Sequence, residues 1–202
     1  MKKLLIFMGI IAGISFMPAD NALSKKEKKA AAKFLKETEK GVLSSIKGLS
    51  VAQLTYKPAA DKWSVEDCMK HIAATEIGLW KMTEGSIKGA ANPEKRSDIK
   101  MTDEDVMMNI ENRTNKVKTF PQFEPQNTGF ATINDAINSF KENRGKLIDY
   151  IKHSEADLRN HVATLPMGSF DSYQMLLFIG AHSNRHMQQI EEVKADPGFP
   201  TN

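Results

Sequence analysis

The sequence predicts an all-α protein, a four-helix bundle with one additional short helical or loop segment. Apolar residues recur every three or four positions over most of the chain, the spacing of helices that bury one face. Prolines and glycines divide these stretches into five segments of helical length. No segment shows a credible alternation of apolar and polar residues, so we expect no strands. At 202 residues the chain is long enough for one domain and short for two.

The first 22 residues have the features of a signal peptide. The start (MKK) is positively charged, and the apolar run over residues 4–17 is too short for a confident membrane span. We expect cleavage after Ala19 or Ala22, with an uncleaved anchor as the alternative. The mature protein would then be a single domain over residues 23–202, exported to the periplasm or secreted, with no stable membrane insertion.

Five helices follow in order, and the first is expected over about residues 25–47. The second opens at Ser64, where Asp67 three residues later completes a capping-box-like pair, and it continues to about residue 87. A long exposed connection separates it from the third helix.

The third helix opens at Thr102, with Asp105 repeating the start signal. Apolar residues at helical spacing, including Val117, extend it to Phe120. Pro121 stops it, because proline lacks the backbone N–H and clashes with the preceding turn.

The fourth helix opens at Thr132, and its inner face runs to Ile151. A loop containing a P-x-G turn leads to the last helix. This helix begins after Asp171 or Ser172 as its N-cap and ends before Pro197.

Three histidines are the candidate functional residues. His182 and His186 lie one turn apart on the last helix and therefore on the same face, and His71 lies on the second helix. All three fall on core-facing stripes, where an imidazole without a partner is costly. A shared metal would remove this cost and leave an open coordination position, as in reactive metal sites. Separate hydrogen bonds to a backbone carbonyl or a water are the alternative, and this alternative stays open.

Other polar residues near these histidines have less defined roles. Gln189, one turn after His186, could orient a ligand or a water, or its amide could instead cover the edge of the core. Thr75 and Glu76 are further candidates for contact with the ligands or for proton transfer. No glutamate lies between His182 and His186, so the zincin protease motif is absent.

The remaining cysteine and histidines are expected to be peripheral to this site. Cys68, the single cysteine, is interpreted as a small buried hydrophobic residue, although a role at the site stays open. His153 is expected on the surface near the end of the fourth helix. His161 lies in the following loop, and no spacing shows whether it approaches the histidines.

At this point the sequence resembles the DinB/YfiT-like superfamily of metal-dependent enzymes, over roughly residues 25–195. The resemblance lies in W-S-x₆-H on the second helix, in a P-x-G turn, and in H-x₃-H-x₂-Q-I on the last helix. The residues that match are Trp63, Ser64, His71, Pro166, Gly168, His182, His186, Gln189 and Ile190.

The resemblance implies a bundle of up-down-down-up topology that binds one divalent metal through His71, His182 and His186. Zinc or nickel are the first candidates for the ion, and iron or manganese the second. Related proteins include thiol-dependent S-transferases, a maleylpyruvate isomerase and stress-induced proteins. An export signal weakens the thiol-transferase interpretation, because low-molecular-weight thiols are chiefly intracellular.

Three functional hypotheses follow from this sequence. The first is a metal-dependent hydrolase or transferase that acts on a small molecule, with its catalytic residues still unidentified. The second is a non-catalytic metal-binding or stress-related bundle, and the third is a bundle whose histidines are only structural. With a net charge of +3 and no basic block, the chain shows no nucleic-acid surface. A homodimer stays open.

Overall fold

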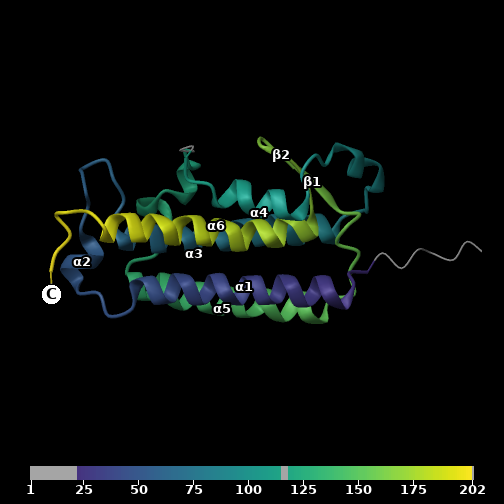
Figure 1. The fold of residues 1–202 in the computed structure, drawn as a ribbon. Coiled ribbons are helices and arrows are strands. Elements are labelled where there is room, and N and C mark those ends of the chain that lie inside the picture. Colours follow the sequence, from purple (N-terminus) through teal and green to yellow (C-terminus); the bar gives the residue numbers. More distant parts are fainter. Residues whose placement is uncertain (1–21, 115–117, 202) are drawn as a thin grey trace, which may run out of the picture.

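The structure is a computed structural model that describes residues 22–114 and 118–201. Four long helices form a bundle: α1 (Lys25–Ile46), α3 (Val65–Lys88), α5 (Ile133–His153) and α6 (Ser172–Lys194). Helices α1 and α3 each pack against both α5 and α6, so they occupy opposite corners of the bundle (Figure 1). The predicted all-α fold class is confirmed.

Contacts between helices fix their directions. The first turns of α1 and α6 are joined and so are their last turns, so these helices run parallel. The first half of α3 contacts the segment that begins α5, and the second half of α3 contacts the end of α5, so these two helices also run parallel. The start of α1 meets the segment after the end of α5, so α1 and α5 run antiparallel. The contacts are Tyr173–Glu27, Lys194–Ser45, Lys70–Ala131, Trp80–Tyr150 and Lys28–Glu155. The topology is therefore up-down-down-up, as the family resemblance implied.

Capping boxes begin the α-helices throughout the described ranges. In each box the side chain before the helix accepts a hydrogen bond from a backbone N–H in the first turn. A side chain in that turn accepts a second hydrogen bond, from the backbone N–H of the residue before the helix. The pairs are Ser24–Glu27, Ser50–Gln53, Ser64–Asp67, Thr102–Asp105, Thr132–Asp135 and Asp171–Gln174. The second pair begins α2 (Val51–Thr55), a single turn too short for its periodicity to show in the sequence.

The third predicted helix is shorter than expected. It corresponds to α4 (Asp103–Glu111), which packs on α6 outside the bundle (Figure 1) and ends well before Phe120. Asn112 takes an extended conformation, and its side-chain oxygen accepts a hydrogen bond from the Thr114 backbone at 2.9 Å. Such a local side-chain bond competes with continuation of the helix. Val117, which the prediction placed on this helix, lies outside the described residues.

Short turns connect the bundle helices. The 3-10 helix η1 (Pro93–Asp98) lies in the exposed connection after α3. Two more, η2 (Pro121–Phe123) and η3 (Pro125–Asn127), follow α4 and lie against α3.

A β-hairpin precedes α6, so the expectation of no strands was wrong. Strand β1 (Val162–Leu165) pairs antiparallel with β2 (Gly168–Asp171), and Pro166 and Met167 form the turn. Each strand has four residues, too few for a distinct alternation of apolar and polar side chains.

A buried ion pair crosses the centre of the bundle. Arg144 on α5 is fully buried, and its guanidinium donates to both carboxylate oxygens of Glu76 on α3, at 2.8 and 2.7 Å. Its remaining bonds go to the Leu35 carbonyl and Thr38 on α1 and to Ser183 on α6. Because one guanidinium binds three other helices, it fixes their relative positions.

The predicted signal peptide falls on residues 1–22, and residues 1–21 lie outside the described part of the chain. Among the described residues, the helices lack the combination of length and apolar character that crossing a membrane requires.

Candidate metal centre

Three histidine rings from two helices converge on one side of the bundle. His71 comes from α3, and His182 and His186 come from α6; one nitrogen from each ring lies within 4.8 Å of the others. Their ring centroids are 4.4, 4.6 and 5.2 Å apart. The structure therefore brings together the three histidines that the sequence analysis singled out.

The His71 ring is oriented by a backbone carbonyl from η2. Its Nδ1 lies 2.7 Å from the Phe123 oxygen, which can only accept, so Nδ1 carries the hydrogen and Nε2 is left with a lone pair. The Phe123 ring rests on Gly78 of α3, where a Cβ would lie 2.5 Å from the ring. The missing side chain at Gly78 thus allows the approach that delivers the Phe123 carbonyl to His71.

A threonine on α3 orients the His182 ring. The Thr75 hydroxyl donates to the His71 carbonyl at 2.7 Å, and its oxygen lies 3.3 Å from Nδ1 of His182. Because the hydroxyl hydrogen is already used, this oxygen accepts from Nδ1, and Nε2 of His182 carries the lone pair.

The third ring, His186, is oriented by the side-chain amide of Gln189. Its Nδ1 lies 3.0 Å from Oε1 of Gln189, and Arg113 donates to the same oxygen at 3.3 Å. Since a guanidinium only donates, the oxygen of the amide must face Arg113, and this orientation also serves His186. Arg113 is itself held by both carboxylate oxygens of Glu192, at 2.6 and 2.7 Å.

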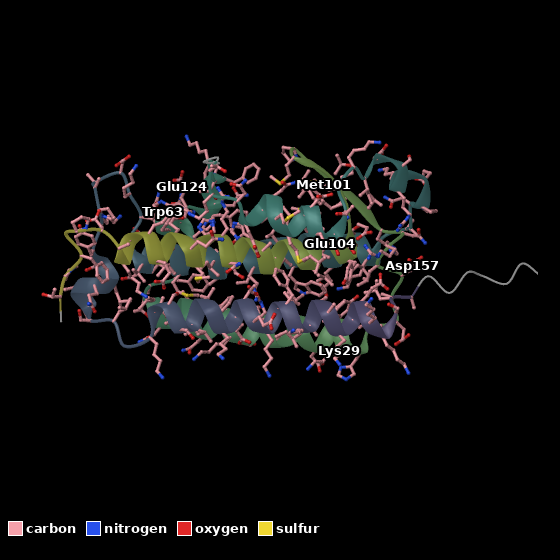
Figure 2. All side chains as sticks on the ribbon, viewed as in Figure 1. Lys29, Trp63, Met101, Glu104, Glu124 and Asp157 are labelled. Carbon is pink, nitrogen blue, oxygen red and sulfur yellow. The ribbon has the colours of Figure 1, made fainter. Side chains whose placement is uncertain are left out.

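Aromatic side chains enclose the three rings. The Trp63 ring stacks on His186 with centroids 5.8 Å apart and lies 4.8 Å from the His71 ring. The Phe178 ring is nearly parallel to His182 at 6.3 Å. Figure 2 shows Trp63 on the same side of the bundle as Glu124, the residue after Phe123.

The histidines are held in their neutral form. Burial lowers the pKa of His71 to about 4, although the hydrogen bond to Phe123 acts in the opposite direction. Burial, followed by the neighbouring histidines, lowers the pKa values of His182 and His186 well below the usual range. Neutral imidazole is the form that binds metal ions.

The arrangement of donors suits a divalent ion. Nε2 of His71 lies 3.4 Å from Nε2 of His182, and the hydrogen bonds above leave neither nitrogen with a hydrogen. Two lone pairs facing each other in this way repel, and a cation between them removes the repulsion. Nitrogen ligands of a tetrahedral zinc ion are roughly 3.3 Å apart. The residues therefore fit a metal ion with a preference for imidazole.

Comparison with known proteins identifies the family. Residues 35–190 match the model of the DinB superfamily. This chain belongs to the DinB superfamily. YuaE of Bacillus subtilis strain 168, described as uncharacterised, is 26% identical to it over 156 residues, which cover 75% of this chain and 89% of YuaE.

One solved structure matches the fold of nearly the whole chain. YfiT from Bacillus subtilis, described as a probable metal-dependent hydrolase with an unusual four-helix bundle topology, matches with a TM-score of 0.60. The match covers 89% of this chain and 92% of YfiT at 15% sequence identity. At that identity the comparison supports the fold alone.

In this DinB protein the histidines lie in a cavity of about 870 Å³. The cavity wall is formed by α3, α4 and α6, by the segment around η2 and by the hairpin turn. Its volume is within the usual range for small-molecule sites.

The other candidates from the sequence lie outside the cluster of the three histidines. Cys68 is fully buried among apolar residues, and burial raises the pKa of its thiol. His161 is buried with Nδ1 2.7 Å from the Asp157 carbonyl. His153 is exposed on the last turn of α5. Glu76 is bound through both oxygens by the buried Arg144.

The groups at the site that were not found from the sequence include the Phe123 carbonyl and the Arg113 guanidinium. A backbone carbonyl leaves no signal in the residue type. Arg113 follows α4 by two residues, where the prediction had placed a continuing helix, so its position against α6 could not be derived.

Proposed function

We propose that this chain is a metal-dependent hydrolase that acts on a small molecule, with one divalent ion bound by Nε2 of His71, His182 and His186. The observation that carries this proposal is that each ring already uses Nδ1 in a hydrogen bond to a neighbouring group. The three Nε2 atoms are therefore the nitrogens left to bind an ion. Three neutral imidazoles favour zinc or nickel, with iron or manganese as alternatives. The description of YfiT as a probable metal-dependent hydrolase supports the same proposal.

An ion bound here would polarise a substrate carbonyl and lower the pKa of a water molecule. The protein would hold the three ligand rings in fixed orientations through Phe123, Thr75 and Gln189. The Trp63 and Phe178 rings exclude water from the faces of the imidazoles that they cover. Fixed ligand orientations of this kind raise metal affinity.

A second candidate is a metal-binding protein without turnover. It is favoured by the pairing of two carboxylates with arginines: Glu76 is bound by Arg144, and Glu192 is bound by Arg113. A carboxylate that is bound through both oxygens by a guanidinium is disfavoured as a general base.

Activity of the metal-loaded protein separates the two candidates. The protein would be stripped with a chelator, reloaded with zinc or nickel, and screened against ester, amide and thiol-adduct substrates. We expect turnover that is lost on chelation, restored by the ion and absent in His182→Ala. The matched control His153→Ala, on an exposed position, should keep wild-type activity. Binding of the ion without turnover of any substrate would favour the second candidate.

A further inference from the structure

The cavity around the histidines is elongated along α6. Its wall includes Phe178, His182, His186, Gln189 and Val193, which lie on one face of that helix. At 1.5 Å per residue, this stretch of helix is about 22 Å long. The histidines lie near its middle, so the cavity extends away from them in both directions.

The two directions differ in chemistry. Asn109 of α4 also lines the cavity, but toward the hairpin the wall is mainly apolar, and we call this part the apolar arm. Its apolar side chains come from α3, α4, the hairpin and α6. These residues are Leu79, Met82, Ile110, Leu165, Met167 and Phe178. Toward the C-terminal end of α6 the wall carries charges of both signs, from Asp61, Lys62, Glu192 and Asp196.

Large apolar side chains are exposed at the mouth of the cavity. Met82 is 43% exposed, Met167 is 47% exposed and Phe120 is 56% exposed, and all three line the cavity. Exposed apolar side chains gathered around one cavity mark a binding surface more often than scattered ones do. Met82 and Met167 lie on the apolar arm, and flexible methionine side chains adapt well to apolar ligands.

The charges around the cavity argue against a polyanionic ligand. Arg113 is neutralised by two bonds to Glu192, and Lys62 lies beside Asp61 at 3.2 Å. The wall also carries Lys118, Arg185 and Asp196, so its four basic and three acidic side chains sum to +1. An excess of one charge provides little of the field that would attract several phosphates or carboxylates. The three imidazoles are among the polar groups that line the middle of the cavity, beside Thr75 and Gln189.

We propose that the cavity binds an elongated amphipathic small molecule that carries an alkyl, acyl or arylalkyl chain. The chain would lie in the apolar arm, between Leu79, Ile110 and Phe178, and the polar group would lie at the three histidines. The position of the polar group rests on the proposed metal site, whereas the position of the chain rests on the cavity wall alone.

A series of straight-chain alkyl hydroxamates tests this proposal, because the head group binds divalent ions and only the chain length changes. Binding of the two- to eight-carbon members to the zinc-loaded full chain would be measured by isothermal titration calorimetry. Burial of each added methylene should tighten binding about fourfold. In the zinc-free protein every member should bind more weakly, with the same dependence on chain length.

Surface methionines provide matched variants. Met82→Gln and Met167→Gln should each weaken binding of the eight-carbon hydroxamate at least about threefold and leave the two-carbon member unchanged. The control Met108→Gln changes an exposed methionine on α4 that does not line the cavity, so it should bind the whole series like wild type.

The possible outcomes separate this proposal from the proposed metal site. Affinity that does not depend on chain length, or a dependence unaffected by Met82→Gln and Met167→Gln, overturns the apolar arm as the binding site. A dependence on chain length in a protein that does not bind zinc supports the apolar arm and contradicts the metal site. Zinc-dependent binding of the two-carbon member, without any effect of chain length, supports the metal site and contradicts the apolar arm.

Discussion

The amide oxygen of Gln189 accepts hydrogen bonds from Nδ1 of His186, at 3.0 Å, and from Arg113, at 3.3 Å. Arg113 therefore selects which end of the amide faces His186. Because that end is the oxygen, His186 keeps its hydrogen on Nδ1 and presents Nε2 to the other rings. A charged side chain outside the ligand cluster thus determines the tautomer of one ligand.

Replacement of Gln189 by leucine should weaken metal binding by about 10- to 100-fold, the usual effect of removing a hydrogen-bond partner of a metal-bound histidine. Competition with a chromophoric zinc chelator would measure the affinity. Gln188→Leu is the matched control, since Gln188 bonds the Glu111 carbonyl instead of a histidine. Equal zinc affinity in Gln189→Leu and wild type would show that the amide does not orient His186.

Replacement of Gly78 by alanine should lower zinc affinity by about tenfold. The new Cβ would lie 2.5 Å from the Phe123 ring, so this ring and the carbonyl that bonds His71 must shift. Gly85→Ala on the same helix is the control, because nothing lies within 4 Å of its Cβ position. That change should keep zinc affinity and raise the free energy of unfolding by about 0.5–1 kcal/mol. Wild-type affinity in Gly78→Ala would remove the role assigned to Phe123.

Much of the fold could be predicted because its signals are local. Capping pairs such as Ser64–Asp67 and Thr132–Asp135 predict where helices begin from a few neighbouring residues, and the structure confirms both starts. The end of α4 could not be predicted, because Val117 and Phe120 continue the apolar spacing beyond the point where Asn112 leaves the helix. The hairpin was missed because its strands are shorter than the window over which alternation can be recognised.

At the candidate site, too, the features set by local sequence could be predicted, and the contacts between distant segments could not. The spacing of His182 and His186 places both on one helical face, and the register of the second helix places His71 on its core-facing stripe. The family resemblance implied that the three bind one ion. The contacts that orient the rings come from segments distant in sequence: the Phe123 carbonyl and Arg113 are each positioned by the irregular chain after α4. No periodicity describes such a segment, so its contribution is visible only in three dimensions.

The metal-free protein should lose stability as the pH falls below about 6.5. His71 has a pKa of about 4 in the folded chain against 6.5 as its ordinary value, so between these values the unfolded chain binds more protons. The free energy of unfolding should therefore fall with decreasing pH, by up to about 1.4 kcal/mol per pH unit for each such histidine. Urea unfolding at pH 7.5, 6 and 5 would measure this slope.

The variant His71→Gln tests the origin of this pH dependence. It should make the slope shallower, because one group that takes up a proton on unfolding is gone. A slope of zero between pH 7.5 and 5 in the metal-free wild type would contradict a neutral, buried histidine cluster.

Replacement of Arg144 by methionine should destabilise the protein by about 3–5 kcal/mol, because Glu76 would be left buried without its partner. The double variant Arg144→Met, Glu76→Leu should recover most of this loss, since both charges are then removed. Denaturant unfolding of the single and double variants measures the two effects. If the double variant is as unstable as Arg144→Met, the bonds of Arg144 to α1 and α6 dominate over the ion pair.

The central claim is that three histidines from two helices share one ion, and the metal content of single variants tests it most directly. After equilibrium dialysis against zinc, the wild type and the exposed-site control His153→Ala should each contain one ion per chain. His71→Ala, His182→Ala and His186→Ala should each lose nearly all of it, because two imidazoles hold a divalent ion poorly. Equal zinc content in the wild type and His186→Ala would contradict the shared site.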